Sequence, residues 1–289
     1  MTNSPGLSEL LTILELEQIE VNLFRAANKD IGSRSVFGGQ VAAQCLSAAI
    51  KTIPDDRHVH SLHGYFILPG DIASPIVFEV DRTRDGRSFT TRRVVAIQHG
   101  KAIFHMSASF QLEQPGMEHQ ISLPDVPRPA ELQSSRELMR KAFADRSLPL
   151  PKFFASDKAV EFRPVEVFDP FVPKAFPPTM HVWFRMDSEL PDDPKLHRIL
   201  LTYVSDFNLL GTALRPHHIP RFSRKLRMAS LDHALWFHRA ARVDQWLLYA
   251  MDTPSSSGSR AFCRGSIYTE EGILVASAAQ EGLMRLKEG

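Results

Sequence analysis

The first third of the chain has the pattern of one helix followed by a run of strands. Small and apolar residues recur at helical spacing between residues 38 and 52, at Val41, Cys45, Leu46 and Ala49. Three stretches with the composition of strands come next, at residues 74–82, 88–98 and 102–112. Asp85-Gly86 separates the first two, and an Asp-Gly pair between strands is typical of a hairpin turn. The pattern therefore predicts a helix packed against an antiparallel meander.

The last third of the chain repeats this order of elements. A helix is predicted first, then three strands, over residues 195–214, 227–238, 261–269 and 273–284. Glu271-Gly272 separates the last two strands, as Asp85-Gly86 does in the first third. A similarity of this length exceeds the period of solenoid repeats and indicates a duplicated unit. The chain is therefore predicted to have an α+β fold, with an antiparallel sheet curled around each of two helices.

The segment between the two copies has a different character. It is rich in proline, at Pro115, Pro124, Pro127, Pro129, Pro149 and Pro151. One helix is expected within it, over residues 134–145, because Ser134 or Ser135 precedes Glu137 as in a capping box. The expected organisation is an N-terminal half, a connector lying over the surface and a C-terminal half, over residues 1–113, 114–160 and 161–289.

Composition and charge narrow the class of protein. The chain has 289 residues, of which 43% are hydrophobic and 23% charged, as is typical of globular proteins. The formal net charge of +1 indicates neither a nucleic-acid surface nor an acidic tail. No stretch approaches the roughly eighteen apolar residues of a membrane span, and two cysteines are too few for a disulfide framework. We therefore expect a cytoplasmic protein with no membrane span and no nucleic-acid partner.

Asp206 interrupts an otherwise apolar face of the second predicted helix. Ile199, Tyr203 and Leu210 share that face, so the carboxylate is expected to point to the interior. A hydrogen bond to nearby backbone, or a place at the edge of the face, would give it a purely structural role. A buried carboxylate without a partner is costly, however, and residues 47–51 in the first copy have no acidic counterpart. This difference between the copies favours a function.

Ser230 and Gln280 are the other polar candidates. Ser230, Asp232 and His233 together suggest a Ser-His-Asp triad. If residues 227–238 form one continuous strand, Ser230 and His233 point to opposite faces, and no Gly-x-Ser-x-Gly motif occurs. Ser230 is therefore expected to be a hydrogen-bonding group and not a nucleophile. Gln280 is either a solvated polar residue near the end of a strand or a ligand-binding group. Its small neighbours, which would let a ligand approach, favour the second interpretation, and its amide both donates and accepts hydrogen bonds.

The sequence offers little support for metal or cofactor chemistry. His58, His60 and His63 cluster without a second group of ligands, and neither Cys-x-x-Cys nor His-Glu-x-x-His occurs. No glycine-rich nucleotide loop is found, so no metal and no cofactor are expected. Five arginines surround a predicted hairpin and form either a solvated face or a site for ligand phosphates: Arg82, Arg84, Arg87, Arg92 and Arg93.

Taken in order, the motifs resemble the acyl-CoA thioesterase II family over nearly the whole length. The matching stretches include Val36-Phe37-Gly38-Gly39-Gln40-Val41, His60-Ser61-Leu62-His63, Asp85-Gly86-Arg87-Ser88-Phe89, Asp232-His233 and Gln280-Glu281-Gly282. The resemblance implies a double hotdog, in which two helix-wrapped antiparallel sheets follow each other in one chain. It also implies hydrolysis of fatty acyl-CoA in fatty acid metabolism, without a cofactor, by a protein that forms homo-oligomers.

The resemblance further implies roles for the three polar candidates. The family uses an Asp, a Thr or Ser, and a Gln to hold and activate a water, and by motif position these fall on Asp206, Ser230 and Gln280. Position 230 is Ser where many relatives have Thr. The developing oxyanion needs backbone N–H donors, and a helix N-terminus provides them, so Gly38 and Gly39 are the candidates for this substrate contact.

Two other functions remain open. Hotdog folds also carry enoyl-CoA hydratases, which pair an Asp with a His on the helix-bearing half. The nearest helical histidine here is His197, nine positions from Asp206 and on another face. A non-catalytic acyl-CoA-binding module would share the fold and the pocket without turnover.

Overall fold

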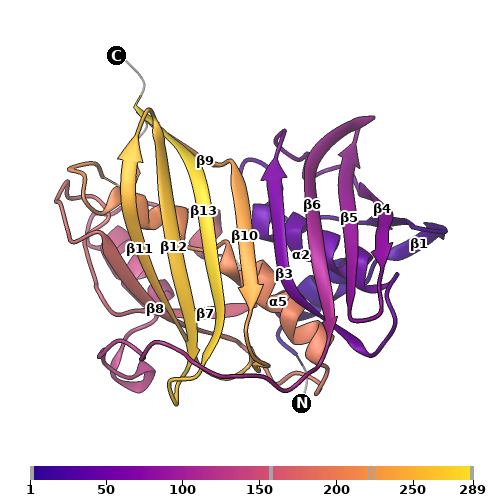
Figure 1. Cartoon of the computed structure of the whole chain (residues 1–289). Coiled ribbons are helices and arrows are strands. Elements are labelled where there is room, and N and C mark those ends of the chain that lie inside the picture. Colours follow the sequence, from indigo (N-terminus) through magenta and orange to yellow (C-terminus); the bar gives the residue numbers. More distant parts are fainter. Residues whose placement is uncertain (1–2, 156–158, 221, 224, 287–289) are drawn as a thin grey trace.

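The computed structural model describes residues 3–155, 159–220, 222–223 and 225–286, which form one curved antiparallel sheet with helices on its inner side (Figure 1). The first half contributes two helices and six strands: α1 (Pro5–Leu14), β1 (Glu17–Glu20), β2 (Leu23–Ala26), α2 (Gly38–Ile50), β3 (Arg57–Phe66), β4 (Ile76–Asp85), β5 (Phe89–Gln98) and β6 (Lys101–Leu112). The strands joined by Asp85-Gly86 and the helix after Gly38 are those that the sequence predicts.

The rest of the described chain contains the connector and the second half. The connector has three short helices: η1 (Pro129–Glu131), α3 (Ser135–Ala144) and α4 (Lys152–Ala155). The second half follows with β7 (Val160–Pro164), β8 (Thr179–Met186), α5 (Pro194–Ser205), η2 (Leu210–Leu214), β9 (Leu226–Ser230), β10 (Asp232–Phe237), β11 (Leu247–Ser257), β12 (Arg260–Thr269) and β13 (Leu274–Leu286). None of the helices in this described part has the length and hydropathy needed to cross a membrane.

The thirteen strands have a palindromic order. Along the sheet they run β1-β2-β4-β5-β6-β3-β10-β13-β12-β11-β8-β7, and β9 pairs with β13 beside this path. β3 and β10 meet antiparallel at the centre, with Leu62 opposite Leu235. Each strand of the first half therefore has a counterpart at the same distance from the centre in the second. The expected α+β architecture is present, with the two sheets joined into one.

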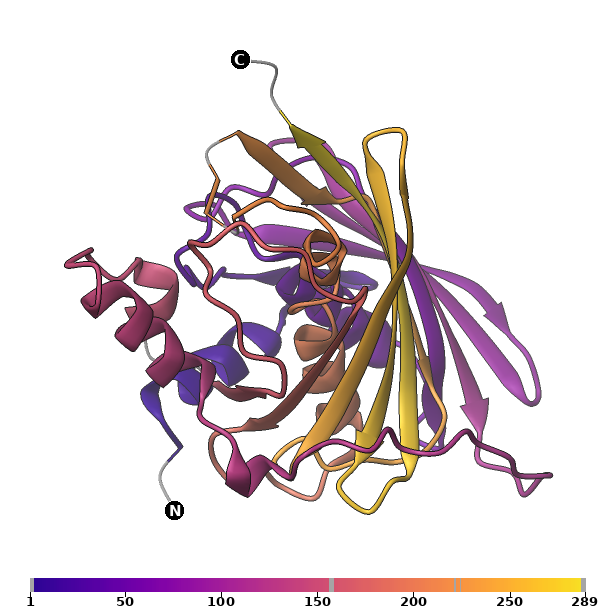
Figure 2. The ribbon, with the colours of Figure 1, turned by 90° about the vertical axis from the view of Figure 1, so that its left-hand side faces the viewer.

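The helices α2 and α5 pack against each other on the inner face of the sheet (Figures 1 and 2). They run in opposite directions, because Gly38 at the start of α2 lies beside Asp206 at the end of α5. At the other end, Lys195 Nζ lies 2.6 Å from Asp55 Oδ1. Gly39 permits the close packing of α2 against α5, since a Cβ at this position would collide with the carbonyl oxygen of Tyr203 in α5.

The helix predicted over residues 195–214 is shorter than expected. α5 ends at Ser205, Asp206 is its C-cap, and Leu210–Leu214 form a separate 3-10 turn. Asn208 lies between them with a φ of 67°, a left-handed conformation through which an α-helix does not continue. The prediction was therefore wrong about the helix length, and Asp206 belongs to its terminus.

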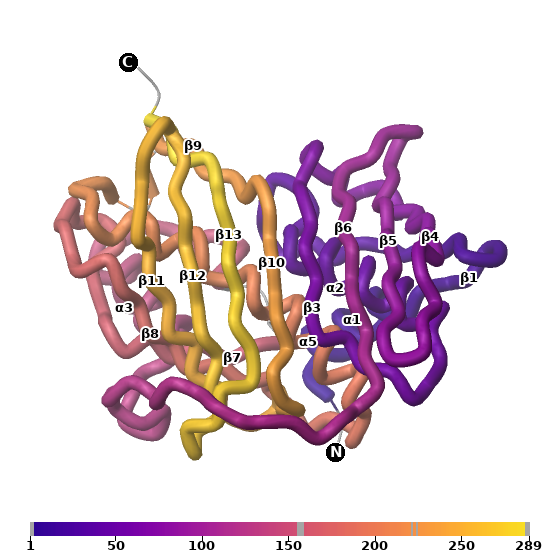
Figure 3. The backbone as a smooth tube through the Cα atoms, in the orientation of Figure 1, coloured from indigo at the N-terminus to yellow at the C-terminus, as the bar shows by residue number. Residues whose placement is uncertain are grey.

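The connector crosses the outer face of the second half before it reaches the inner side (Figures 2 and 3). On the outer face, the indole Nε1 of Trp183 donates to the carbonyl oxygen of Pro127 at 2.9 Å. Gln120 donates to the carbonyl oxygen of Gly272 at 2.8 Å, next to the turn between β12 and β13. A small hydrophobic cluster lies buried on this face: Trp183, Leu248 and Tyr268.

The second part of the connector holds the helix that its sequence predicts. α3 begins after Ser134, whose hydroxyl accepts the backbone N–H of Glu137, and the Glu137 carboxylate accepts the N–H of Ser134 in return. This reciprocal pair is the expected capping box. Besides lying over the surface, α3 and α4 help to line a cavity on the inner side of the sheet.

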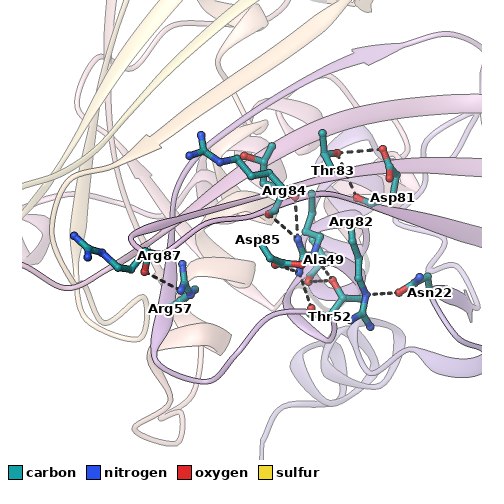
Figure 4. A network of polar contacts seen from close by, with 12 residues as sticks. Asn22, Ala49, Thr52, Arg57, Asp81, Arg82, Thr83, Arg84, Asp85 and Arg87 are labelled. Carbon is teal, nitrogen blue, oxygen red and sulfur yellow. Dashed lines mark hydrogen bonds and ion pairs between the residues drawn. The ribbon is translucent and has the colours of Figure 1, made fainter.

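One of the five arginines near the first hairpin has a structural role that the sequence does not reveal. Arg92 is 1% exposed, and its guanidinium donates to Thr52 Oγ1 at 2.9 Å, Asp85 Oδ1 at 2.6 Å and the carbonyl oxygen of Arg84 at 3.1 Å. Figure 4 shows Thr52, Arg84 and Asp85 close together where the hairpin meets the end of α2. Neither expected role, a solvated face or a phosphate site, applies to Arg92, because this buried group fastens the hairpin to the helix.

Candidate active site

Asp206 lies where the end of α5 meets the start of α2. Its Oδ1 accepts a hydrogen bond from Gln280 Nε2 at 2.7 Å. Its Oδ2 faces Gly38, because a Cβ on Gly38 would lie only 2.8 Å from that oxygen. The carboxylate therefore bridges a strand of the second half and a helix of the first. Both halves of the chain contribute to this site.

Gln280 occupies the inner face of β13, so the alternative of a solvated residue does not apply. It is 1% exposed and is flanked on that face by the small residues Ala278 and Gly282. Its Nε2 also lies 3.1 Å from Ser230 Oγ, so one amide group joins Asp206 and Ser230. Its Oε1 is buried and has no hydrogen-bond partner among the described residues. An unpaired buried acceptor is costly, and a bound water would satisfy it.

A β-bulge brings Ser230 to this face. Ser230 pairs with Gly282, whereas Ala234 pairs with Ala279, so the strand after Ser230 contains one residue more than its partner β13. Within the bulge, the Asp232 carboxylate accepts the backbone N–H of Glu281 at 2.6 Å. The bulge reverses the alternation of side chains between β9 and β10.

The predicted orientation of Ser230 and His233 is corrected by this bulge. Residues 227–238 are not one continuous strand, and both side chains contact Gln280 on the inner side. No nucleophile-base pair results, since His233 Nε2 bonds Ser205 Oγ at 2.8 Å and Ser230 bonds Gln280. The conclusion that Ser230 is a hydrogen-bonding group therefore stands, for a different reason.

His233 is buried behind Gln280 and was not predicted as a site residue. Burial lowers the pKa of its imidazole, although the nearby carboxylates of Asp206 and Asp232 oppose this shift. The ring is therefore neutral at pH 7. The sequence contains one indication of this role, because His233 lies only three residues after Ser230. The bulge, which the sequence does not reveal, brings both Ser230 and His233 into contact with Gln280.

Gly38 and Gly39 form the first turn of α2, whose N-terminal N–H groups have no partner within the helix. The N-cap residue Phe37 makes no side-chain capping hydrogen bond, which leaves these donors available. The positive end of the helix dipole faces Asp206 at this point, and an anion would be stabilised there.

A cavity of about 510 Å³ opens beside Asp206, within the range of roughly 300–1,000 Å³ usual for ligand pockets. Of the predicted site residues, only Asp206 lines it. Phe37, Phe207 and Asn208 surround the carboxylate end of the cavity. Its walls are largely apolar and come from β7, β8, the segment between these two strands and the connector, at Leu138, Met139, Phe153, Phe154, Phe162, Val167, Phe168, Met180 and Val182.

The helical histidine that a hydratase would require is engaged elsewhere. His197 Nε2 lies 3.1 Å from the carbonyl oxygen of Pro191, and its Nδ1 accepts the N–H of Val243 at 3.2 Å. It lies near the start of α5, whereas Asp206 caps the end. In the described ranges, no group of three or more His, Cys, Asp or Glu side chains is arranged to hold a metal ion.

Comparison with known proteins decides the family. A family model described as Acyl-CoA thioesterase matches residues 149–283, and one described as Acyl-CoA thioesterase N-terminal domain matches residues 26–111. The chain is 39% identical to Acyl-CoA thioesterase 2 of Haemophilus influenzae over 98% of its length and 99% of that protein. It belongs to the acyl-CoA thioesterase II family.

Solved structures agree with this acyl-CoA thioesterase assignment. Acyl-CoA thioesterase II TesB2 from Mycobacterium marinum is 43% identical and superposes with a TM-score of 0.80, over 97% of this chain and 99% of that one. A protein of unknown function with a hotdog fold from Alicyclobacillus acidocaldarius is 20% identical, with a TM-score of 0.76 over 97% of this chain and 99% of that one. The latter likeness shows the fold alone. The predicted double hotdog is confirmed, and the chain is an acyl-CoA thioester hydrolase.

Proposed function

We propose that this thioesterase hydrolyses fatty acyl-CoA by direct attack of a water held by Asp206, Ser230 and Gln280. The observation that carries the proposal is that Asp206 and Ser230 both contact the side-chain amide of Gln280. Gln280 Nε2 lies 2.7 Å from Asp206 Oδ1 and 3.1 Å from Ser230 Oγ. Three separate elements contribute them, so their proximity is a property of the fold.

In the proposed reaction, Asp206 acts as the general base. It accepts a proton from the water while the water oxygen bonds to the thioester carbonyl carbon. Ser230 and the Oε1 of Gln280 orient the water, because a positioned nucleophile avoids much of the entropic cost of the encounter. The carbon–sulfur bond then breaks, and the proton passes from Asp206 to the sulfur of CoA. The products are a fatty acid and CoA.

The start of α2 is the proposed oxyanion site. Charge develops on the carbonyl oxygen as the water attacks, and N–H donors already in place stabilise it without reorganisation. Gly38 and Gly39 carry such donors beside Asp206, and neither has a Cβ to obstruct the substrate. The reaction as proposed uses only side chains, backbone and water, without a metal or cofactor.

The cavity is the proposed site of the acyl group. Asp206 is at its edge, and the apolar walls formed by β7, β8, α3 and α4 suit a hydrocarbon chain. We place the N-terminal half at residues 1–113, the connector at 114–160 and the catalytic half at 161–289. We further propose that the enzyme acts in fatty acid metabolism as a cytoplasmic homo-oligomer without a nucleic-acid partner.

The proposal is tested by thiol release from acyl-CoAs of increasing chain length, with the wild type beside Asp206→Asn. The expected loss of kcat is about a hundredfold or more, since a positioned general base typically contributes 10²–10⁴-fold. Asp252→Asn is a matched control, because Asp252 pairs with Arg264 on the surface. Equal rates for wild type and Asp206→Asn would remove Asp206 from the mechanism. Binding without release of thiol would instead establish a non-catalytic module.

A further inference from the structure

His233 contacts the catalytic amide without facing the cavity. It is 1% exposed, it does not line the cavity, and each of its ring nitrogens lies near a polar atom of the protein. We propose that His233 is a positioning residue that sets the orientation of the Gln280 side-chain amide. This proposal rests on the proposed function, in which Gln280 holds the attacking water.

The hydrogen bonds of Ser205 determine which nitrogen of His233 carries the proton. The Ser205 hydroxyl donates to the carbonyl oxygen of Thr202 at 2.9 Å, in the last turn of α5, where carbonyl groups lack helical partners. A hydroxyl has one proton, so its contact with His233 Nε2 at 2.8 Å requires the imidazole to donate. In the neutral ring, Nδ1 is then an acceptor.

This acceptor and Asp206 together select one orientation of the amide. Gln280 Nε2 lies 2.7 Å from Asp206 Oδ1, 3.1 Å from Ser230 Oγ and 3.4 Å from His233 Nδ1. One of its two protons points to Asp206, and the other is shared between Ser230 and Nδ1. The Ser230 hydroxyl can both donate and accept, so it does not distinguish the two orientations of the amide. The reversed amide would direct its oxygen at a carboxylate and at a lone pair, and both contacts would be repulsive. In the selected orientation Oε1 is directed at neither group and is buried without a partner among the described residues, where it can accept a proton of the water.

The surroundings of His233 keep this arrangement fixed. Tyr249 donates its hydroxyl to the carbonyl oxygen of Ser205 at 2.9 Å, which holds the end of α5 against the sheet. Asp206 and Asp232 are the carboxylates nearest to the ring, and both would favour its protonation. Burial outweighs them and lowers the pKa of His233, so Nδ1 retains its lone pair.

Three substitutions separate the two ring contacts. The side-chain oxygen of Asn is as many bonds from Cβ as Nδ1, so His233→Asn can keep the acceptor facing Gln280. His233→Gln reaches the position of Nε2 instead and keeps only the contact with Ser205. His233→Leu removes both. We expect kcat to fall by about a hundredfold in the Gln and Leu variants, with KM unchanged, because a misplacement of about 1 Å costs that much. His233→Asn is expected to restore most of kcat.

His197 is the matched control for burial and hydrogen bonding. It is 3% exposed, it bonds protein groups through both ring nitrogens, and it lies near the opposite end of α5. His197→Asn and His197→Leu are expected to lower the melting temperature with kcat per folded molecule unchanged. Wild-type kcat in His233→Leu, or equal losses in His233→Asn and His233→Gln, would overturn the positioning role.

A second measurement does not depend on turnover. The ¹⁵N chemical shifts of the His233 ring report its tautomer, and the proposal requires a protonated Nε2 and a bare Nδ1. A proton on Nδ1 would overturn the inference even if the enzyme hydrolyses acyl-CoA as proposed. Conversely, the expected tautomer in a protein without any thiol release would contradict the proposed function and leave the hydrogen-bond assignment of His233 supported.

Discussion

Gln280 Nε2 lies 2.7 Å from Asp206 Oδ1, which connects the middle of β13 to the end of α5. Ser230 and His233 converge on the same amide from β9 and β10. The polar groups of the site are thus held by strands and a helix terminus instead of by long loops. Such a site is preorganised, and small changes in its support are expected to affect turnover more than substrate binding.

Gly38 is expected to be essential for turnover because of its closeness to Asp206. In Gly38→Ala the new Cβ would lie 2.8 Å from Asp206 Oδ2 and 2.8 Å from the ring of Phe66, so the carboxylate must move. We expect kcat to fall by about a hundredfold. Gly116→Ala is the control, since no atom lies within 4 Å of its Cβ position. Steady-state kinetics on both variants checks this, and an unchanged kcat in Gly38→Ala would show that Asp206 Oδ2 can move freely.

The connector helix α3 is expected to influence acyl chain length. Leu138 and Met139 line the cavity from α3, so Leu138→Trp or Met139→Trp reduces its volume. We expect kcat/KM for long acyl-CoAs to fall about tenfold and kcat/KM for short acyl-CoAs to stay unchanged. The indole would occupy space in which several methylene groups of a long acyl chain are otherwise buried. Arg140→Trp is the control because Arg140 is exposed on the same helix. A uniform loss across all chain lengths would place the acyl group elsewhere.

Arg92 is expected to contribute to stability and not to activity. Arg92→Met leaves Thr52 and the Arg84 carbonyl oxygen without the donor they now have, at the opposite end of α2 from Asp206. We expect the free energy of unfolding to fall by about 3 kcal/mol, as for other buried charged hydrogen-bond partners. Urea denaturation measures this, with the exposed Arg93→Met as control. A loss no greater than that of the control would contradict the structural role.

The neutral His233 is expected to make stability depend on pH. Its pKa in the folded protein is lowered by burial, so the unfolded chain binds its proton more readily. The contribution of the neutral imidazole to the free energy of unfolding is complete above the pKa of about 6.5 that the group has in the unfolded chain. It is lost as pH falls through and below that value. His233→Asn lacks the group, so its stability should decline less than that of wild type between pH 7.5 and pH 5. Chemical denaturation at both pH values checks the slopes, and identical slopes would exclude the effect.

Local patterns were sufficient for the elements that lie within one stretch of sequence. The helix after Gly38 and the hairpin at Asp85-Gly86 follow from spacing and turn chemistry, and both are present. The capping box of Ser134 and Glu137 is similarly local. These predictions required no knowledge of contacts between distant segments.

Features that depend on distant partners were not predictable in this way. Within the bulge between Ser230 and Ala234, Asp232 accepts the N–H of Glu281 on another strand, a contact that local sequence does not reveal. Without that contact, strict alternation is the natural expectation, and it separates Ser230 from His233 incorrectly. The buried state of Arg92 and the place of α3 beside the cavity likewise depend on contacts that close only in the folded chain.

The palindromic strand order has a consequence for stoichiometry. Within it, the antiparallel pair α2 and α5 creates two places where one helix ends beside the start of the other, and the C-cap residue is Asp206 at the end of α5 but Lys51 at the end of α2. At the end of α2, Arg92 donates to the carbonyl oxygen of Thr52, and Asp55 is paired with Lys195 Nζ at 2.6 Å. Titration with a tight-binding substrate analogue is therefore expected to saturate at one molecule per chain, half the number that two identical units would bind.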